Sequence, residues 1–198
     1  MPRKRQSQEN LRNRIIQESR KITRSIWYGT RRPVWHQVTS EAANEGIEDA
    51  LADTKGLNTI SPTWFSVTDN SGNISSIASI DYVDYAHQCG LEVWALVDNF
   101  DQNVDDMELL SHTSSRENLE NQLVNTALQN GIDGINVDFE QIPTDVGEHY
   151  IQFIRELSVL CRVNNLVLSV DNYVPKGYNT HYHREEQGVM ADYVIIMG

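Results

Sequence analysis

The stretch Asp133-Gly134-Ile135-Asn136-Val137-Asp138-Phe139-Glu140 decides the fold. Its apolar and polar side chains alternate, which is the period of two of a β-strand. Helical patterns flank it on both sides, as expected for a parallel sheet covered by helices. In a barrel of that kind the apolar residues face the helices, so we expect Asn136, Asp138 and Glu140 to line the interior. Unpaired carboxylates are costly there, and the strand ends in acid where barrel active sites lie, so the stretch indicates a functional site.

The rest of the chain repeats the strand and helix order. Strands are expected at residues 34–38, 57–61, 91–97, 135–139, 166–170 and 191–197, and helices at about 40–53, 80–89, 115–130, 144–163 and 181–187. This order predicts an α/β protein, an incomplete (β/α)₈ TIM barrel with about six of its eight strand–helix units, since the fold typically needs about 250 residues. A doubly wound open sheet would also hold six strands, but its Gly-rich phosphate loop is absent.

The charges of the chain are divided unevenly. The net charge is −12, yet residues 1–32 contain ten of the sixteen Lys and Arg and only two of the 28 Asp and Glu, which gives +8 there and −20 in residues 33–198. We therefore expect residues 1–32 to be a basic tail outside the barrel and residues 33–198 to be the domain. An acidic domain argues against nucleic acid as partner and is compatible with a neutral sugar polymer.

Two alternatives remain open for the basic tail. Leu11, Ile15, Ile22 and Ile26 fall near one helical face among Arg and Lys, which favours an amphipathic helix that binds a membrane or an anionic polymer. A solvated tail is the other interpretation. No run reaches the eighteen or so apolar residues needed to cross a bilayer, and no apolar core of a signal peptide follows the basic start.

The octet resembles the D-G-x-D-x-D-x-E signature of glycoside hydrolase family 18, the chitinase-like enzymes, with Asn136 in place of the middle aspartate. The resemblance extends over about residues 34–198. The segments Ser-Pro-Thr-Trp-Phe (61–65), Val-Trp-Ala-Leu-Val-Asp (93–98) and Tyr-Val-Ile-Ile-Met-Gly (193–198) are similar to a bacterial branch that includes spore-cortex and cell-wall glucosaminidases. Met197-Gly198 matches the start of the family's Met-x-Tyr-Asp motif, so the resemblance implies a domain truncated after strand six.

The resemblance implies hydrolysis of β-linked N-acetylglucosamine polymers, with no cofactor and no metal. In that family the substrate's own acetamido oxygen attacks the anomeric carbon, so one residue donates a proton and another orients the acetamide. By resemblance these are Glu140 and Asp138. The bacterial branch favours peptidoglycan or spore cortex over chitin and implies an extracellular or cell-envelope location. Truncation would impair this chain and open the barrel's edges to self-association.

Three other interpretations stay open. The domain could be a non-catalytic carbohydrate-binding module of the same fold, which Asn136 and the truncation favour and the retained Glu140 argues against. It could also be a fragment without a stable fold. The acids alone could be a structural cluster or a metal site, although three polar residues on one strand without a nearby His suit a transition metal poorly. With an amide at position 136, Asp138 loses a like-charged neighbour that would raise its pKa.

Further residues at strand ends are candidates for sugar contact. Val-Asp-Asn-Phe (97–100) and Val-Asp-Asn-Tyr (170–173) echo each other at two such ends. The substrate contacts expected there and nearby are Asp98, Asn172, Tyr173, Trp64, Met197 and Asn136. Asx turns that close the strands, and a core position for the tryptophan, are the alternatives. Asp133 and Gly134 are expected to be structural.

The cysteines and two of the histidines are expected to be structural or solvated. Cys89 and Cys161 lie in apolar helical contexts, which favours buried thiols over a disulfide or a metal site. His181 and His183 lie in a polar loop, where solvated side chains are expected in preference to a metal pair.

Overall fold

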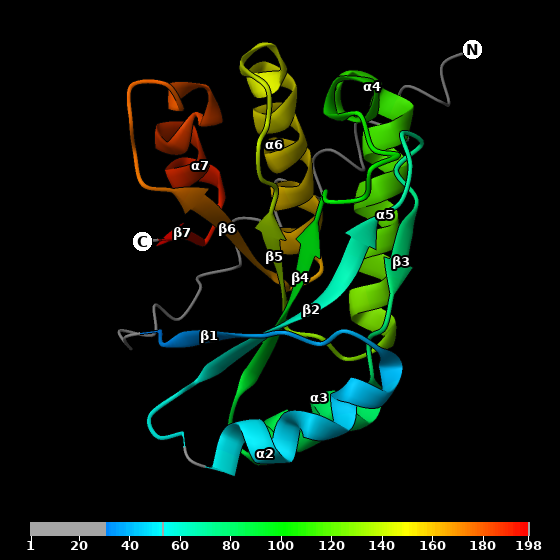
Figure 1. The fold of residues 1–198 in the computed structure, drawn as a ribbon, viewed down its shortest axis with the longest axis vertical. Coiled ribbons are helices and arrows are strands. Elements are labelled where there is room, and N and C mark those ends of the chain that lie inside the picture. The colour runs from blue at the N-terminus through cyan, green and yellow to red at the C-terminus, as the bar shows by residue number, and fades with distance from the viewer. Residues whose placement is uncertain (1–30, 53, 198) are drawn as a thin grey trace, which may run out of the picture. The chain divides into compact units, whose positions relative to one another are not determined.

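A computed structural model of the chain describes residues 31–52 and 54–197 (Figure 1). The chain divides into two units, Met1–Thr30 and Arg31–Gly198, and the fold described below is that of the second. The expected amphipathic helix and nearly all of the expected basic tail lie outside the described residues. None of the described helices is long and apolar enough to span a membrane.

Six parallel strands form the sheet and follow one another in the order of the chain. They are β1 (Pro33–His36), β2 (Thr59–Val67), β4 (Glu92–Asp98), β5 (Gly134–Asp138), β6 (Val167–Tyr173) and β7 (Tyr193–Met197). The sheet curls into part of a barrel (Figure 1). The predicted incomplete TIM barrel is confirmed, and the sequential order excludes a doubly wound sheet, in which the order reverses at a switch point.

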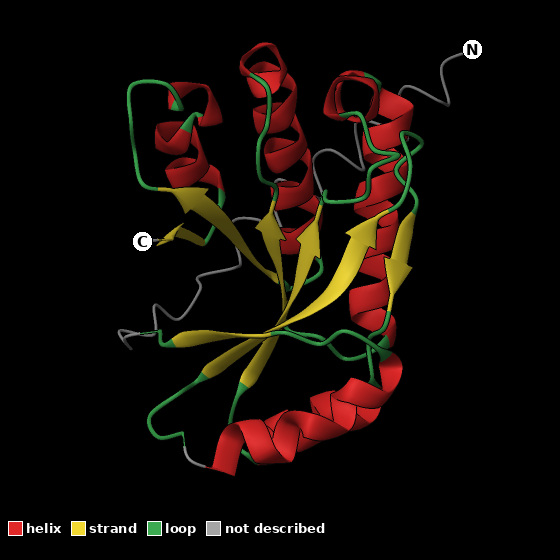
Figure 2. Ribbon diagram, in the orientation of Figure 1, coloured by secondary structure: helices red, strands yellow, loops and turns green. Residues whose placement is uncertain are grey.

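Helices connect the strands and cover the outer face of the sheet (Figure 2). In Figure 1, α5, α6 and α7 stand side by side, while α2 and α3 lie together beside β1 and β2. The helical segments are η1 (Glu41–Gly46), α2 (Ile47–Ala52), α3 (Ile80–Gln88), α4 (Asp106–Ser111), α5 (Thr113–Gln129), η2 (Thr144–Val146), α6 (Gly147–Val163), η3 (Thr180–Tyr182) and α7 (Arg184–Met190). Ser40 caps η1, because its hydroxyl accepts a hydrogen bond from the Ala43 amide.

The side chains of β5 alternate as the octet predicts. Ile135 and Val137 are fully buried, and Phe139 stacks on Phe153 and Tyr150 of α6 at ring distances of 5.5 Å and 6.1 Å. The aromatic stack fixes the outer face of the strand against the helix. A slip of one residue would place these rings inside the barrel and the acids in the apolar layer, so the register of the strand is strongly specified.

A short antiparallel strand, β3 (Ile74–Ser76), pairs with the end of β2. The sequence predicts only a loop at this position and a β2 strand that stops at residue 61. In the turn between the two strands, the Asp69 carboxylate accepts hydrogen bonds of 2.8 Å from the Ser71 amide and from the Asn73 side chain. The turn can therefore be predicted from the sequence, but a strand of three residues is too short to show a recognisable alternation.

The two cysteines are free and differ in exposure. Cys161 is buried on α6 as predicted, whereas Cys89 is exposed, so the prediction of a buried thiol is wrong there. The buried face of α3 is formed by Tyr82, Val83 and Ala86. Position 89 would continue that face in a longer helix, but α3 ends at Gln88 and the chain turns away at Gly90, where φ is 78°.

Candidate functional site

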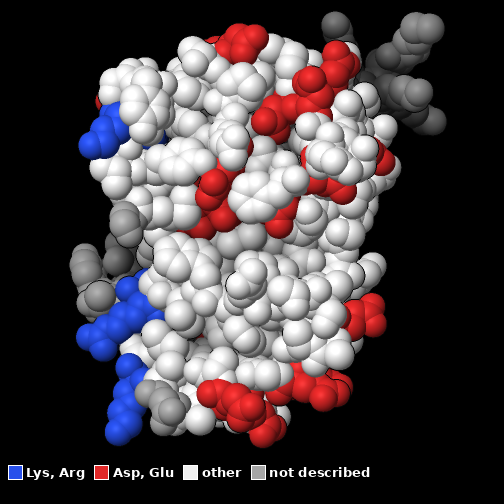
Figure 3. Space-filling view, in the orientation of Figure 1, with Lys and Arg blue, Asp and Glu red and all other residues white. Residues whose placement is uncertain are grey.

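Four carboxylic side chains from three neighbouring strands meet at the carboxyl ends of the sheet. We call Asp98, Asp138, Glu140 and Asp171 the acid cluster. They come from the end of β4, the end of β5, the loop after β5, and β6. Figure 3 shows acidic side chains gathered on this face, over the carboxyl ends of β4 and β5. The alternation of β5 and the register of its neighbours therefore concentrate negative charge where barrel enzymes carry their active sites.

Glu140 is held by its backbone and by its carboxylate. The Asn99 side chain accepts a hydrogen bond from the Glu140 amide (3.0 Å) and donates one to the Glu140 carbonyl (3.1 Å). The Tyr173 hydroxyl donates a hydrogen bond of 2.7 Å to Glu140 Oε2. Burial and the neighbouring Glu140 raise the pKa of Tyr173, which keeps its hydroxyl protonated as a donor. Asn99 and Tyr173 thus fix the position of Glu140.

Asp138 lies in an environment that favours its neutral form. Burial, followed by the charges of Asp171, Glu140 and Asp98, raises the pKa of Asp138 to about 7. Its Oδ1 atom is buried and has no hydrogen-bond partner among the described residues. A carboxyl with a raised pKa and an unpaired buried oxygen, placed at the carboxyl end of a barrel strand, is a candidate for a functional group.

Asp171 lies beside Asp138 within a buried polar network. Its Oδ2 atom accepts hydrogen bonds from the Asn136 amide (2.7 Å) and from the Trp35 indole (3.0 Å). The Ser169 hydroxyl donates to the Asn136 oxygen, which fixes the orientation of that amide. Burial raises the pKa of Asp171 to about 6, although both hydrogen bonds act in the opposite direction.

Asp138 of the acid cluster lines a cavity of about 430 Å³ on the inner face of the sheet. Residues of five strands line it: Trp35, Thr63, Leu96, Asp138, Ile196 and Met197. Trp35 is 43% exposed, so part of its indole is available to a ligand. An aromatic ring next to carboxyl groups in an open cavity suits a sugar ring, which presents an apolar face and hydroxyl groups.

The structure brings most of the predicted site residues to this cavity or to the acid cluster. Glu140, Asp138, Asn136, Asp98, Tyr173 and Met197 lie there. Asp98 also closes β4 with an Asx-type turn, because its Oδ1 accepts hydrogen bonds from the Phe100 amide (3.1 Å) and from the Ser66 hydroxyl (2.7 Å). For Asp98, the two interpretations from the sequence are therefore compatible.

Two of the predicted substrate contacts lie elsewhere. The Trp64 ring is 2% exposed, donates to Asn44 (2.8 Å) and packs edge-on against Tyr82, so neither of its faces is open to a sugar. Asn172 points to the outer face of β6, where its amide donates to Gln187 of α7 (2.6 Å). Both residues stabilise the contact between strands and helices.

Asp133 and Gly134 lie at the opposite end of β5 from the acid cluster. The Asp133 carboxylate accepts hydrogen bonds of 2.8 Å from the Val93 amide and from His87, which ties the entry of β5 to β4 and α3. A Cβ atom on Gly134 would lie 2.8 Å from Trp94 Cδ1 and 2.9 Å from Val167. Glycine at this position lets the Trp94 ring cross the floor of the barrel.

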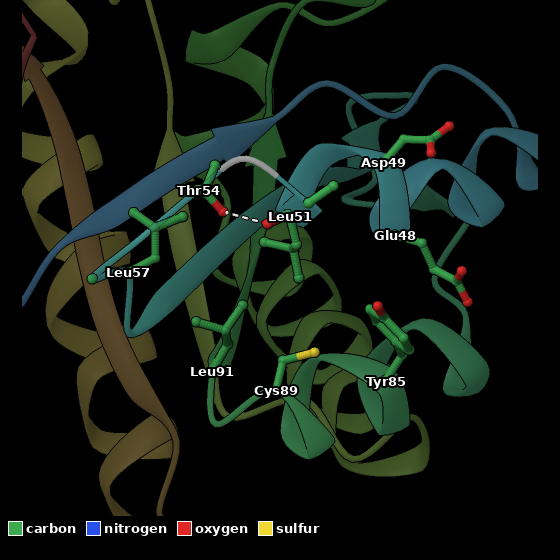
Figure 4. A pocket seen from close by; sticks show the side chains of 10 residues that line it. Glu48, Asp49, Leu51, Thr54, Leu57, Tyr85, Cys89 and Leu91 are labelled. Carbon is green, nitrogen blue, oxygen red and sulfur yellow. Dashed lines mark hydrogen bonds between the residues drawn. The ribbon is translucent and has the colours of Figure 1, made fainter.

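A second cavity, of about 500 Å³, lies between α2 and α3, away from the acid cluster (Figure 4). Glu48 and Asp49 line it from α2, and Tyr85 of α3 and Cys89, the residue that follows α3, line it from the other side. Among the described residues no three His, Cys, Asp or Glu side chains are grouped so that they could hold a metal ion. His181 bonds the Ile142 carbonyl at 2.8 Å, and His183 lies 3.3 Å from Glu148.

Three residues of the site escape the sequence prediction although their positions carry a signal. Trp35 and Asp171 occupy the inward-facing phase of β1 and β6, which the period of two could have identified. Asn99 belongs to one of the two echoed strand ends, where the sequence predicts its neighbour Asp98 as the contact instead. Two neighbouring residues of a strand face opposite sides, so choosing between them requires knowing which of them faces inward. In β6, Asp171 lies two residues before Tyr173 and shares its face, whereas Asn172 lies on the opposite face.

Comparisons with known proteins agree with this fold. No protein-family model matches the chain. The chain is 25% identical over 155 residues to "Uncharacterized glycosylase YvbX" of Bacillus subtilis (strain 168), which covers 71% of this chain and 44% of that protein. A chitinase from Chromobacterium violaceum ATCC 12472 has a TM-score of 0.70 at 20% identity and covers 85% of this chain and 56% of its own. The spore cortex-lytic enzyme SleL of Bacillus megaterium QM B1551 has a TM-score of 0.70 at 19% identity and covers 83% and 41%.

The structural likeness establishes the fold: the described residues form part of a chitinase-like barrel, with six parallel strands in sequential order. The chain spans about half the length, or less, of the relatives that it matches.

Proposed function

We propose that this chain carries the catalytic carboxyl groups of a family 18-like glycoside hydrolase. Such an enzyme cleaves β-linked N-acetylglucosamine polymers with retention of configuration. The observation that supports this most is the position of Glu140. The Tyr173 hydroxyl holds the Glu140 carboxylate at the mouth of the barrel. Glu140 follows Asp138 by two residues, and the pKa of Asp138 is raised to about 7. One carboxyl to donate a proton and one to hold an acetamide are the two groups that substrate-assisted hydrolysis needs.

In the proposed reaction, Glu140 protonates the glycosidic oxygen as the bond to the anomeric carbon breaks. The acetamido oxygen of the same sugar attacks that carbon and forms an oxazolinium ion, and Asp138 accepts a hydrogen bond from the acetamido N–H and stabilises the positive charge. Glu140, now a carboxylate, then takes a proton from the water that opens the ion, which returns the enzyme to its starting state. Two displacements at one carbon give retention.

The proposed substrates are peptidoglycan or spore cortex in preference to chitin. The similarity to the B. subtilis glycosylase and to the cortex-lytic enzyme SleL supports this choice. Trp35, half-exposed beside Asp138, is the proposed platform for the sugar ring next to the scissile bond. Such polymers lie outside the cytoplasmic membrane, so we also propose an extracellular or cell-envelope location.

The test is the release of reducing ends from peptidoglycan and from N-acetylglucosamine oligomers. The protein is assayed in a form that contains all eight strands, with the 198-residue chain beside it. Glu140→Gln keeps the shape of the side chain but has no proton to donate, so we expect kcat to fall by about 10²–10⁴-fold or more while binding persists. Asp138→Asn is expected to slow the reaction as well, because the oxazolinium ion loses its counter-charge.

Glu108→Gln is the matched control, since it removes one acidic charge from α4 outside the acid cluster. It is expected to leave kcat unchanged. Binding of the oligomers without release of reducing ends by any form would instead favour a carbohydrate-binding module. Full activity of Glu140→Gln would remove Glu140 from the mechanism and refute the proposal.

A further inference from the structure

Asp138 and Asp171 occupy adjacent in-register positions of two parallel strands. Val137 of β5 pairs with Val170 of β6, so the next residue of each strand is an aspartate. Both side chains face the interior, and neighbouring strands lie about 4.8 Å apart. Asp171 is 1% exposed. The fold therefore places two carboxyl groups side by side in a mostly buried site, where two negative charges are strongly disfavoured.

Each of the two carboxyl groups has one oxygen without a partner. Asp138 Oδ1 and Asp171 Oδ1 are buried and receive no hydrogen bond from the described residues. The other oxygen of Asp171 is occupied by the Asn136 amide and the Trp35 indole. Unpaired buried oxygens are costly, and two of them on adjacent carboxyl groups are satisfied together when one proton lies between them.

The surrounding charges make this arrangement stronger. Beyond burial, the charges that act on Asp138 come from Asp171, Glu140 and Asp98, and all three are acidic. Tyr173 and Tyr150 face the group from β6 and α6, and the pKa of each is raised, so both remain neutral. Among residues 31–52 and 54–197 no cation acts on either carboxyl, so a shared proton is the compensation that these residues leave.

We propose that Asp171 is a positioning residue that shares one proton with Asp138, and so replaces from β6 the carboxyl that the family's signature carries at position 136 of β5. The proposal rests on the proposed function, in which Asp138 holds the acetamide. Without ligand the pair holds one proton. When the acetamido N–H donates to Asp138, that proton resides on Asp171 Oδ1, so Asp138 becomes an anion and no proton enters or leaves the site.

Asn136 and Trp35 acquire a defined role in this arrangement. They hydrogen-bond Asp171 Oδ2 and leave Oδ1 as the site of the proton. Ser169 orients Asn136 so that its NH₂ group, and not its oxygen, faces Asp171. An aspartate at position 136 in this setting would add a third carboxyl to the buried pair, which explains why an amide suits the position.

The test is a titration that needs neither substrate nor turnover. Aspartate side-chain carboxyl carbons are labelled with ¹³C in the 198-residue chain, and the resonance of Asp138 is followed against pH in the wild type and in Asp171→Asn. We expect Asp138 to titrate near neutrality in the wild type and at least about one pH unit lower in Asp171→Asn, because its proton-sharing partner is gone. An unchanged Asp138 titration in folded Asp171→Asn would overturn the proposal.

Relocation of the carboxyl is the sharper variant. In the double variant Asn136→Asp/Asp171→Asn, a carboxyl is restored two residues before Asp138, on the same face of β5. We expect the raised titration of Asp138 to return. Asp98→Asn, which removes an acid of the same cluster on β4, is expected to shift Asp138 less than Asp171→Asn does. A shift as large from Asp98→Asn would mean general repulsion and refute the pairing.

Two further measurements keep the outcome clear. If Asp171→Asn does not fold, as judged by circular dichroism, Asp138→Asn is used and the titration of Asp171 is followed; it is expected to fall, and an unchanged value contradicts the pairing. In the eight-stranded form, Asp171→Asn is expected to shift the pH dependence of kcat and to change KM less. The double variant is expected to restore the pH dependence of kcat. Absence of hydrolysis in the wild type would refute the proposed function, while the titration would still decide the pairing.

Discussion

At the scale of single residues, Gly134 determines whether the floor of the barrel can form. Trp94 lies across this floor, where its indole donates to Glu92 (3.1 Å) and packs on Tyr193 at a ring distance of 5.0 Å. The guanidinium of Arg31 lies 5.8 Å from the centre of the same ring. All of these contacts depend on the missing side chain at position 134, which explains why the octet begins with Asp-Gly.

Gly134→Ala is expected to lower the free energy of unfolding by about 1–3 kcal/mol, as overpacking of a dense core does. The new methyl group would lie 2.8 Å from Trp94 Cδ1 and 2.9 Å from the Val167 carbonyl. Urea unfolding measures the change. Gly188→Ala on α7 is the control: no atom lies within 4 Å of the added carbon, so a gain of about 0.5–1 kcal/mol is expected. Equal effects of the two changes would contradict the role given to Gly134.

The candidate site illustrates what could be predicted from the sequence at this scale. Alternation identified the inward face of β5, and a family resemblance drew attention to Asp138 and Glu140. Trp64 and Asn172 were selected because their residue types suit sugars, yet both face the helices. Residue type alone does not tell which side of a strand a side chain occupies. The partners of Asp171 are 35 and 136 positions away in the chain, a distance over which a local pattern carries no information.

At the scale of elements, the contact between α5 and α6 contains a buried acid. Glu120 is 3% exposed and lies beside Glu156, which accepts hydrogen bonds from Arg116 of 2.7 Å and 3.3 Å. Burial, and then the charge of Glu156, raises the pKa of Glu120 to about 8. The protonated form of Glu120 is therefore the one that fits between the two helices.

The sign of the resulting pH dependence follows from linkage. Because the pKa of Glu120 is raised in the folded state, the folded protein binds more protons than the unfolded chain between about pH 4.5 and pH 8, so this residue makes stability fall as pH rises through that range. Glu120→Gln should match the wild type near pH 4 and exceed its stability by about 1–3 kcal/mol at pH 9, because glutamine cannot ionise and no buried charge forms. Thermal unfolding at several pH values measures this.

Glu117→Gln, an exposed position on the same helix, removes the same charge and should show little pH-dependent gain. A parallel gain in both variants would mean that the net charge, and not the buried site, governs the effect.

Among elements, the long helices and the six parallel strands were predictable from periodicity. The short α4 and β3 were not, because six and three residues are too few to establish a period.

At the scale of the whole molecule, one group of acidic side chains lies over the sheet ends that carry the site, and others lie at the opposite end of the view (Figure 3). Within the described residues, β1 and β7 each pair on one side only, and Trp35 and Ile196 on these strands are 43% and 45% exposed. Apolar side chains on unpaired edge strands favour association. Self-association of the 198-residue chain stays a prediction from the sequence.

The anomeric form of the first product tests the proposed chemistry most directly. Proton NMR follows the cleavage of N-acetylglucosamine oligomers by the eight-stranded form in its first minutes, before mutarotation mixes the anomers. Attack by the acetamido oxygen followed by water requires two inversions, so the new reducing end should appear first as the β-anomer, and Glu140→Gln should give no early signal. An α-anomer appearing first would mean a single displacement by water and would contradict the mechanism built on Glu140 and Asp138.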